Sequence, residues 1–231
     1  MSLSGLDLLL FHAINDLCGK SETFDLIVGS LDISALKSLA IVTTFGALWH
    51  LPSKDQYRQR EILLMLFVTV AASLVLNRTI SLIVPFRLRP MSAMDVGYNS
   101  PLKSHHTDLE SWSSFPSDNA TLLFAVATCF WFVSRRWAFW FAMFSGVALL
   151  ARIYLGVHYP FDVVVGAALG VGVALALLGE PVRAIIARPL LAWERRAPAY
   201  FCGLLFAALF EMATLFSLTR FFGKAALRLL G

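Results

Sequence analysis

Long apolar stretches recur along the chain and are separated by shorter segments rich in polar and basic residues. A helix needs roughly 20 mostly apolar residues to cross the hydrocarbon of a bilayer, so each stretch predicts a transmembrane helix. Five such spans are expected, at residues 33–51, 60–84, 117–133, 137–155 and 162–178.

The two ends of the chain complete this pattern. Residues 200–222 are apolar and long enough to cross the bilayer, although they carry Glu211, and they predict a sixth span. Residues 3–17 mix Leu and Phe with Asp7 and His12, which is typical of a short helix lying in the membrane interface. The expected fold is an all-α, polytopic membrane bundle of about six transmembrane helices with an N-terminal interfacial helix.

Composition supports a single integral membrane domain over residues 1–231, because the chain is 58% hydrophobic, 15% charged and has a mean hydropathy of +0.71. The net charge of +4 comes from basic residues gathered between the spans. This distribution predicts contact with membrane lipid headgroups, and no nucleic-acid motif is present. The three cysteines have no metal or disulfide spacing, and no pattern indicates an oligomeric state.

Basic residues also orient the expected spans, because cytoplasmic loops carry an excess of Lys and Arg. They follow the first, third and fifth spans, and they are Lys54, Arg58, Arg60, Arg135, Arg136, Arg183, Arg188, Arg195 and Arg196. The alternate connections, 85–115 and 156–161, are therefore expected to lie together on the outer face.

The connection 156–161 carries the most informative polar residues, since ionisable groups near hydrocarbon are costly and indicate function. Asp162 follows His158 by four residues and can reach back to one imidazole nitrogen, leaving the other free as a nucleophile. Arg152 at the end of the preceding span suits bidentate phosphate binding. Taken singly, these residues have simpler explanations, namely helix capping for Asp162 and headgroup contact for Arg152.

Further candidates for anion binding lie in the connection 85–115 and at the start of the third span. Ser117 follows Pro116 at a helix start, where backbone N–H groups and a hydroxyl favour an anion, and Asp118 comes next. Ordinary N-capping is the alternative for Ser117. Arg87 and Arg89 close the second span, where they can either clamp a phosphate or anchor the helix in the interface.

In combination, these residues resemble the three signature motifs of the type 2 phosphatidic acid phosphatase superfamily of membrane lipid phosphatases. The matching segments are Arg89-Pro90, Pro116-Ser117-Asp118-Asn119, and Arg152 with His158 and Asp162, within a catalytic core of about 77–170. The resemblance implies a reaction without metal or cofactor, in which His158 attacks phosphorus and forms a phosphohistidine. It also implies that Asp162 orients His158, and that Ser117, Arg89 and Arg152 stabilise the phosphoryl oxygens.

A finer resemblance is to the bacterial undecaprenyl-diphosphate phosphatase branch, through the Arg87–Pro90 segment, the pair His105 and Asp108, and the segment ending in Asp118. It implies a lipid phosphate or polyprenyl diphosphate substrate, the bacterial cytoplasmic (inner) membrane, and a site facing the periplasm. His105, His106, Asp108 and the deeper Arg78 are candidate substrate contacts. A metal held by the loop residues is the less favoured alternative, because no helical spacing fixes them as ligands.

One expected residue differs from the family pattern. Asn119 stands where the family has a histidine that protonates the leaving oxygen and later activates water. Because an amide does not titrate and acid–base help is worth ~10²–10⁴ in rate, this form is expected to be an impaired phosphatase. Asn119 fits either an introduced inactivating replacement or divergence toward a lipid-phosphate binding or translocating protein or a phosphotransferase.

Overall fold

The computed structural model describes residues 5–101 and 112–213, and every regular element in these ranges is helical. In chain order the elements are α1 (Gly5–Asn15), α2 (Glu22–Leu31), α3 (Ser34–His50), α4 (Gln56–Ile83), the short 3-10 turn Pro90–Ser92, α5 (Asp118–Val133), α6 (Arg135–Tyr154), α7 (Pro160–Leu177), α8 (Glu180–Arg196) and α9 (Pro198–Ala213). The all-α prediction is confirmed.

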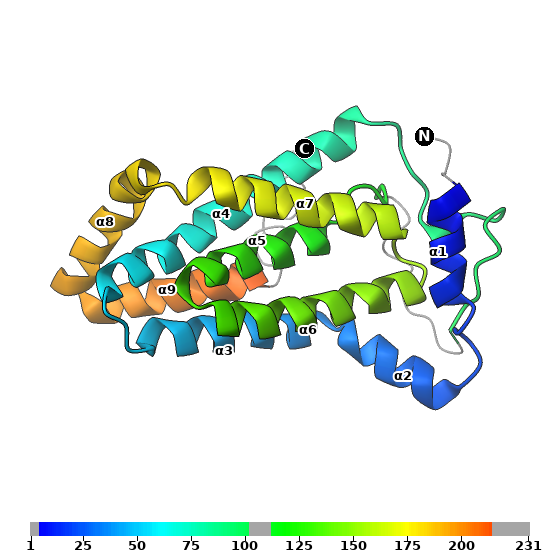
Figure 1. Cartoon of the computed structure of the whole chain (residues 1–231), viewed down its shortest axis with the longest axis horizontal. Helices are drawn as coiled ribbons and strands as arrows, with labels where there is room; N and C mark the ends of the chain where they lie inside the picture. The colour runs from blue at the N-terminus through cyan, green and yellow to red at the C-terminus, as the bar shows by residue number, and fades with distance from the viewer. Residues whose placement is uncertain (1–4, 102–111, 214–231) are drawn as a thin grey trace, which may run out of the picture.

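The helices α3, α4, α5, α6, α7 and α9 run along the long axis of an elongated bundle (Figure 1). Helix α5 lies inside it and packs against α4, α6 and α7. The core consists of buried apolar side chains such as Leu123 and Phe130 of α5 and Leu66 of α4. Enclosure by its neighbours explains why α5 is apolar nearly all round.

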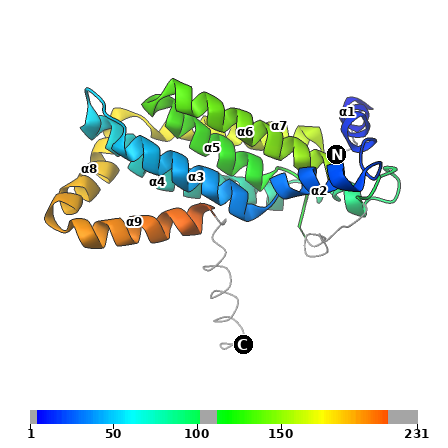
Figure 2. The ribbon, with the colours of Figure 1, turned by 90° about the horizontal axis from the view of Figure 1, so that it is seen from below.

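Two helices close the ends of this bundle. Helix α1 lies across the end where α6 connects to α7, and it packs against both (Figure 1). Helix α8 lies at the opposite end, between α7 and α9, and Figure 2 shows α9 running back from it along the bundle. The predicted interfacial helix at 3–17 corresponds to α1.

The helices α4, α6 and α7 are each long and apolar enough to cross a membrane. Helices α2 and α3 together form a further candidate span that is bent by 45° at the break between them, while α5 and α9 are shorter apolar helices. The protein is therefore an integral membrane protein of the polytopic type predicted from the sequence.

Two segments that were expected to be connections are helical. Helix α2 begins after Ser21, whose hydroxyl accepts a hydrogen bond from the Phe24 N–H at 3.4 Å. Helix α8 contains the basic residues that predicted a cytoplasmic loop, and Arg188 in it binds Glu61 of α4 at 2.8 Å. The expected sixth span corresponds to α9, with its later residues outside the described part of the chain.

Glycines allow α5 and α7 to approach closely near one end of the bundle. A Cβ atom added to Gly166 would overlap the carbonyl oxygen of Ser117, and one added to Gly170 would overlap that of Thr121. Because the helices are this close, the Thr121 hydroxyl donates a hydrogen bond to the Gly166 carbonyl at 3.0 Å. These two glycines therefore make a close α5–α7 contact within one chain, and it fixes the start of α5 against α7.

Candidate active site

The turn between α6 and α7 positions the two ends of the third sequence motif. Helix α6 ends at Tyr154 and is followed by its C-cap residue Leu155 and by Gly156. Gly156 has a φ of 69°, a left-handed conformation that suits glycine and terminates the helix. The Val157 N–H then donates back to the Arg152 carbonyl at 2.9 Å. Pro160 starts α7 after this turn, so His158 is held just before the helix.

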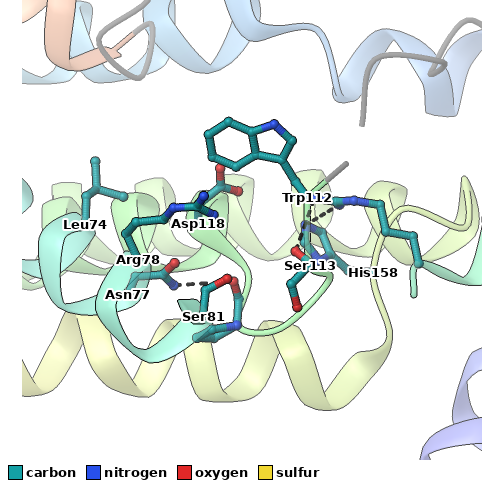
Figure 3. Close-up of a pocket in the computed structure, with 10 residues that line it drawn as sticks. Leu74, Asn77, Arg78, Ser81, Trp112, Ser113, Asp118 and His158 are labelled. Carbon is teal, nitrogen blue, oxygen red and sulfur yellow. Dashed lines mark hydrogen bonds between the residues drawn. The ribbon is translucent and has the colours of Figure 1, made fainter. Parts of the chain in front are cut away.

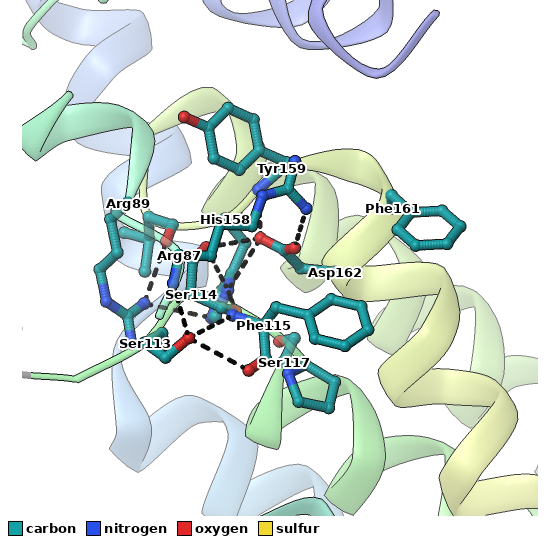
Figure 4. Close-up of polar contacts among 12 residues, drawn as sticks. Arg87, Arg89, Ser113, Ser114, Phe115, Ser117, His158, Tyr159, Phe161 and Asp162 are labelled. Atoms are coloured by element: carbon teal, nitrogen blue, oxygen red, sulfur yellow. Dashed lines mark hydrogen bonds and ion pairs between the residues drawn. The ribbon is translucent and has the colours of Figure 1, made fainter. Parts of the chain in front are cut away.

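The imidazole of His158 is 1% exposed and has different neighbours at its two nitrogens (Figure 4). Nδ1 lies 2.9 Å from the carbonyl oxygen of Ser114. A carbonyl oxygen can only accept, so in the neutral ring Nδ1 carries the proton and Nε2 carries the lone pair. Nε2 lies 3.4 Å from the Nη1 atom of Arg89.

The charge state of His158 is set mainly by its burial, which lowers the pKa of the imidazole below its usual value. The nearby guanidiniums of Arg152 and Arg89 lower the pKa further, while Asp162 opposes these effects. The ring is therefore neutral at pH 7 and its Nε2 lone pair is available for attack.

Asp162 is completely buried and accepts hydrogen bonds from several residues around His158. Its carboxylate accepts hydrogen bonds from the Ser114 hydroxyl, the Tyr159 N–H at 2.9 Å and the Arg87 guanidinium. The distance from Asp162 Oδ2 to His158 Nδ1 is 3.8 Å, longer than a hydrogen bond. The expected direct bond is therefore replaced by an indirect one, in which Asp162 fixes Ser114 and the Ser114 carbonyl fixes His158.

Arg87 and Arg89 face different partners. Arg89 is buried and donates to the Val157 carbonyl at 3.0 Å, beside His158. Arg87 instead bridges the carboxylates of Asp7 and Asp162 and stacks on the Tyr159 ring at 4.1 Å. Two carboxylates occupy the Arg87 guanidinium in this structure, and the predicted phosphate contact of Arg87 stays a prediction.

Ser117 caps the start of α5. Its hydroxyl accepts from the Ala120 N–H at 3.4 Å, and its own N–H donates to the Asp162 carbonyl at 3.1 Å. The side chain is buried, and the peptide bond between Phe115 and Pro116 just before it is cis. Capping, the simpler explanation weighed from the sequence, describes the hydroxyl in this structure, and the predicted phosphate contact of Ser117 stays a prediction.

Asn119 belongs to a buried polar cluster formed with three other elements. Its Oδ1 atom accepts from the Lys37 ammonium at 3.0 Å, and its Nδ2 atom donates to Asp118 at 3.1 Å. Lys37 also donates to Asp32 Oδ1 at 2.8 Å, and the same oxygen accepts from Arg152 at 2.6 Å. The structure thus joins the second and third motifs through Asp32 and Lys37.

A pocket of about 240 Å³ opens beside His158 (Figure 3). Its polar lining comes from α4, from the start of α5 and from the segments that precede α5 and α7, and its lining residues are Leu74, Asn77, Arg78, Ser81, Arg89, Trp112, Ser113, Pro116, Asp118 and His158. The Arg78 guanidinium lies 4.4 Å over the Trp112 ring. The pocket therefore offers two guanidiniums and one imidazole to an anionic ligand.

The structure brings together most of the residues that the sequence singled out. Arg78, Arg89, Asp118 and His158 line the pocket, while Asn119 and Arg152 lie in the adjoining polar cluster. The loop candidates His105, His106 and Asp108 lie outside the described residues. Asp32 and Ser114 were missed, although an acidic residue five positions before Lys37 in an apolar context was a usable signal for Asp32.

Comparison with known proteins gives consistent results. The profile of the PAP2 superfamily matches residues 61–183. The Escherichia coli K12 protein named "Putative undecaprenyl-diphosphatase YbjG" is 30% identical over 168 residues, or 71% of this chain and 77% of that protein. The undecaprenyl-diphosphatase BcrC of Bacillus subtilis 168 is 29% identical over 154 residues, covering 67% and 73% of the two chains. The crystal structure of Aquifex aeolicus LpxE shares the fold, with a TM-score of 0.53 and 20% identity over 75% of this chain and 94% of that one.

Proposed function

This chain belongs to the PAP2 superfamily, and from that membership we propose that it is a membrane-embedded phosphatase of a lipid phosphate or diphosphate. The substrate class we infer is a polyprenyl carrier of the undecaprenyl type, because two relatives are named undecaprenyl-diphosphatases. The observation that carries the proposal is the His158 ring, whose Nε2 lone pair points toward Arg89 while Nδ1–H is held by Ser114.

The proposed reaction starts with attack of His158 Nε2 on phosphorus. The Nε2–P bond forms and the imidazole acquires a positive charge. The bond that breaks joins phosphorus to the lipid oxygen of a monophosphate or to the bridging oxygen of a diphosphate. Asp162 lies 3.8 Å from Nδ1 and stabilises this charge. Water then attacks phosphorus, the Nε2–P bond breaks, and inorganic phosphate leaves while His158 returns to its neutral form. Over the whole reaction, one proton of water ends on the oxygen that departed with the lipid.

Buried guanidiniums favour the anionic phosphoryl group in this reaction. Arg89 lies beside Nε2, and Arg78 lines the same pocket. The Nε atom of Arg152 is buried and has no hydrogen-bond partner among the described residues, which suits donation to a phosphoryl oxygen. These groups supply charge stabilisation without requiring a metal ion.

The inferred orientation places this site on the periplasmic face of a bacterial inner membrane. The α3–α4 and α5–α6 connections lie at the end of the bundle opposite the α6–α7 turn (Figure 1). That opposite end carries Lys54, Arg58, Arg135 and Arg136, and an excess of basic residues is typical of the cytoplasmic side.

Asn119 favours a second candidate function, that of a lipid-phosphate binding or translocating protein. Its amide is hydrogen-bonded on both sides and cannot exchange a proton. A phosphotransferase that passes the phosphoryl group from His158 to another acceptor is the third candidate. Release of inorganic phosphate, binding without turnover, and acceptor-dependent transfer distinguish the three.

The test compares two substrates in two variants. Phosphate release from a polyprenyl monophosphate and a polyprenyl diphosphate is measured for the unmodified protein and for Asn119→His. We expect Asn119→His to raise the monophosphate rate more, because an alkoxide needs a proton more than a departing phosphate does. Addition of His158→Ala should abolish turnover and the acid-labile phosphoenzyme. Background rates for both substrates in Asn119→His would instead favour the binding function.

A further inference from the structure

The contacts of Lys37 in the folded protein suggest a catalytic role that its position in the sequence does not indicate. Lys37 lies in the first turn of α3 and is 4% exposed, and its ammonium contacts Asn119 at 3.0 Å and Asp32 at 2.8 Å. Resting on the proposed phosphatase function, we propose that Lys37 is the proton donor and acceptor that residue 119 cannot be. It would be a catalytic residue specific to the Asn119 form of the site.

The hydrogen bonds of Asn119 explain how the amide cooperates with this lysine. An ammonium only donates and a carboxylate only accepts, so Lys37 must face Oδ1 and Asp118 must face Nδ2. Asp118 also lines the pocket, so two hydrogen bonds connect the Lys37 ammonium to a residue of the pocket wall. The proposed step requires Nζ to leave Asn119 and to move, on the flexible lysine stem, to the leaving oxygen in the adjoining pocket.

The surroundings of Lys37 allow it to lose a proton at a low cost. Asp32 Oδ1 accepts from both Lys37 and Arg152, so the carboxylate keeps a cationic partner when Lys37 becomes neutral. Asp118 is the other charged group that faces Lys37. Two of the three ammonium N–H groups have acceptors within the described residues, which leaves one for the substrate.

The proton balance of the reaction is complete with this assignment. As His158 Nε2 bonds to phosphorus and the P–O bond to the lipid breaks, the proton of Lys37 passes to the departing oxygen. The neutral amine then takes a proton from water while the water oxygen attacks phosphorus. Inorganic phosphate and His158 are released, and Lys37 is again an ammonium.

The decisive experiment compares substrates that differ in their need for a proton. A prenyl monophosphate leaves as an alkoxide, whereas 4-nitrophenyl phosphate has a much better leaving group. Lys37→Arg keeps the positive charge beside Asp32 but removes the titratable proton, because arginine stays protonated in proteins. We expect the ratio of prenyl to nitrophenyl turnover to fall by ~10²-fold or more in Lys37→Arg and in Lys37→Met.

Two controls accompany this measurement. Lys54→Arg changes an exposed lysine at the other end of the bundle and should leave the ratio unchanged. Asn119→His introduced into Lys37→Arg should restore the ratio, because a histidine at this position supplies the proton again. Turnover of nitrophenyl phosphate in each variant reports that the site is folded.

The outcomes separate this inference from the proposed function. Equal loss of both substrates in Lys37→Arg, or no rescue by Asn119→His, would show that Lys37 only positions Asp32, and would overturn the inference. An inactive unmodified protein with an active Asn119→His variant would also overturn it, while the proposed phosphatase function would stand. Inactivity of every variant on both substrates would contradict both the Lys37 inference and the proposed phosphatase function.

Discussion

The chemistry of His158 depends on a neighbour that contributes its backbone rather than its side chain. The Ser114 carbonyl selects the Nδ1–H form of the ring, and the Ser114 hydroxyl is in turn bound by Asp162. A carbonyl of the backbone cannot be removed by substitution, so the orientation of the proposed nucleophile is robust to most single changes. Its pKa, by contrast, responds to the charges and the burial around it.

The pH response of His158 is a direct test of this environment. Burial lowers the pKa of the imidazole, so protonation should occur below the usual value of about 6.5, and the nucleophile should stay neutral through pH 7. Histidine-labelled ¹⁵N NMR in micelles should show an Nδ1-protonated ring with its titration midpoint below that value. His158→Gln identifies the resonance, and a midpoint above 6.5 would contradict this account.

Arg87 provides a second prediction for a single residue. Arg87→Gln leaves the buried carboxylates of Asp7 and Asp162 facing each other, so the free energy of unfolding should fall by about 3–5 kcal/mol. Measured in the Asn119→His background, kcat should fall while KM changes little, because Arg87 does not line the pocket. Arg78→Gln is the matched control and should raise KM instead. A rise in KM for Arg87→Gln would instead indicate that Arg87 binds the phosphate of the substrate.

The sequence predicted the residues of the site that lie close together in the chain better than those that do not. Arg152, His158 and Asp162 share one turn, so their spacing alone brought them together. The ion pair of Arg87 with Asp7 was not predicted, because Asp7 belongs to α1, far away in the chain. Lys37 was not among the predicted site residues for the same reason, since its contact with Asn119 exists only after α3 packs against α5.

Among the helices, the contact of α5 with α7 has the greatest influence on the site. Gly170→Ala would place a methyl group against the backbone of Thr121, and overpacking of this kind costs ~1–3 kcal/mol. We expect thermal unfolding in micelles to show that loss of stability. Gly172→Ala, on the same helix, has open space around its new methyl group and should unfold at or above the temperature of the unmodified protein. Equal effects of the two substitutions would contradict the close contact.

Apolar length identified the long helices correctly but did not predict α2 and α8. The apolar stretches matched α3 to α7 to within a few residues, because hydrophobic runs of this length have few alternatives in a membrane chain. Helix α8 carries four arginines and Pro189, a composition that predicts a loop. Its ion pairs with Glu61, which only tertiary structure brings near, stabilise it as a helix.

The whole molecule is expected to have its two ends on opposite sides of the membrane. Ser53, between α3 and α4, is exposed at the basic end of the bundle. Ser100 is exposed at the site end, where its neighbour Asn99 bonds to Asn15 of α1. In a protein without its native cysteines, Ser100→Cys should react with an impermeant thiol reagent in intact spheroplasts, while Ser53→Cys should react only after lysis. The reverse pattern would invert the topology. Tyr159, which shares the site end, is 1% exposed and unsuited to such labelling.

The unequal lengths of α4 and α5 determine how deep the pocket lies in the bilayer. The 16 residues of α5 extend roughly 24 Å, less than the roughly 30 Å of hydrocarbon. Beyond Ser81, which lines the pocket, the chain continues with the exposed apolar side chains of Leu82, Ile83, Phe86 and Leu88. We therefore expect hydrocarbon to surround the chain above the level of the pocket. A lipid headgroup would then have to move below the headgroup plane to react, and turnover would depend on membrane thickness as well as on chemistry.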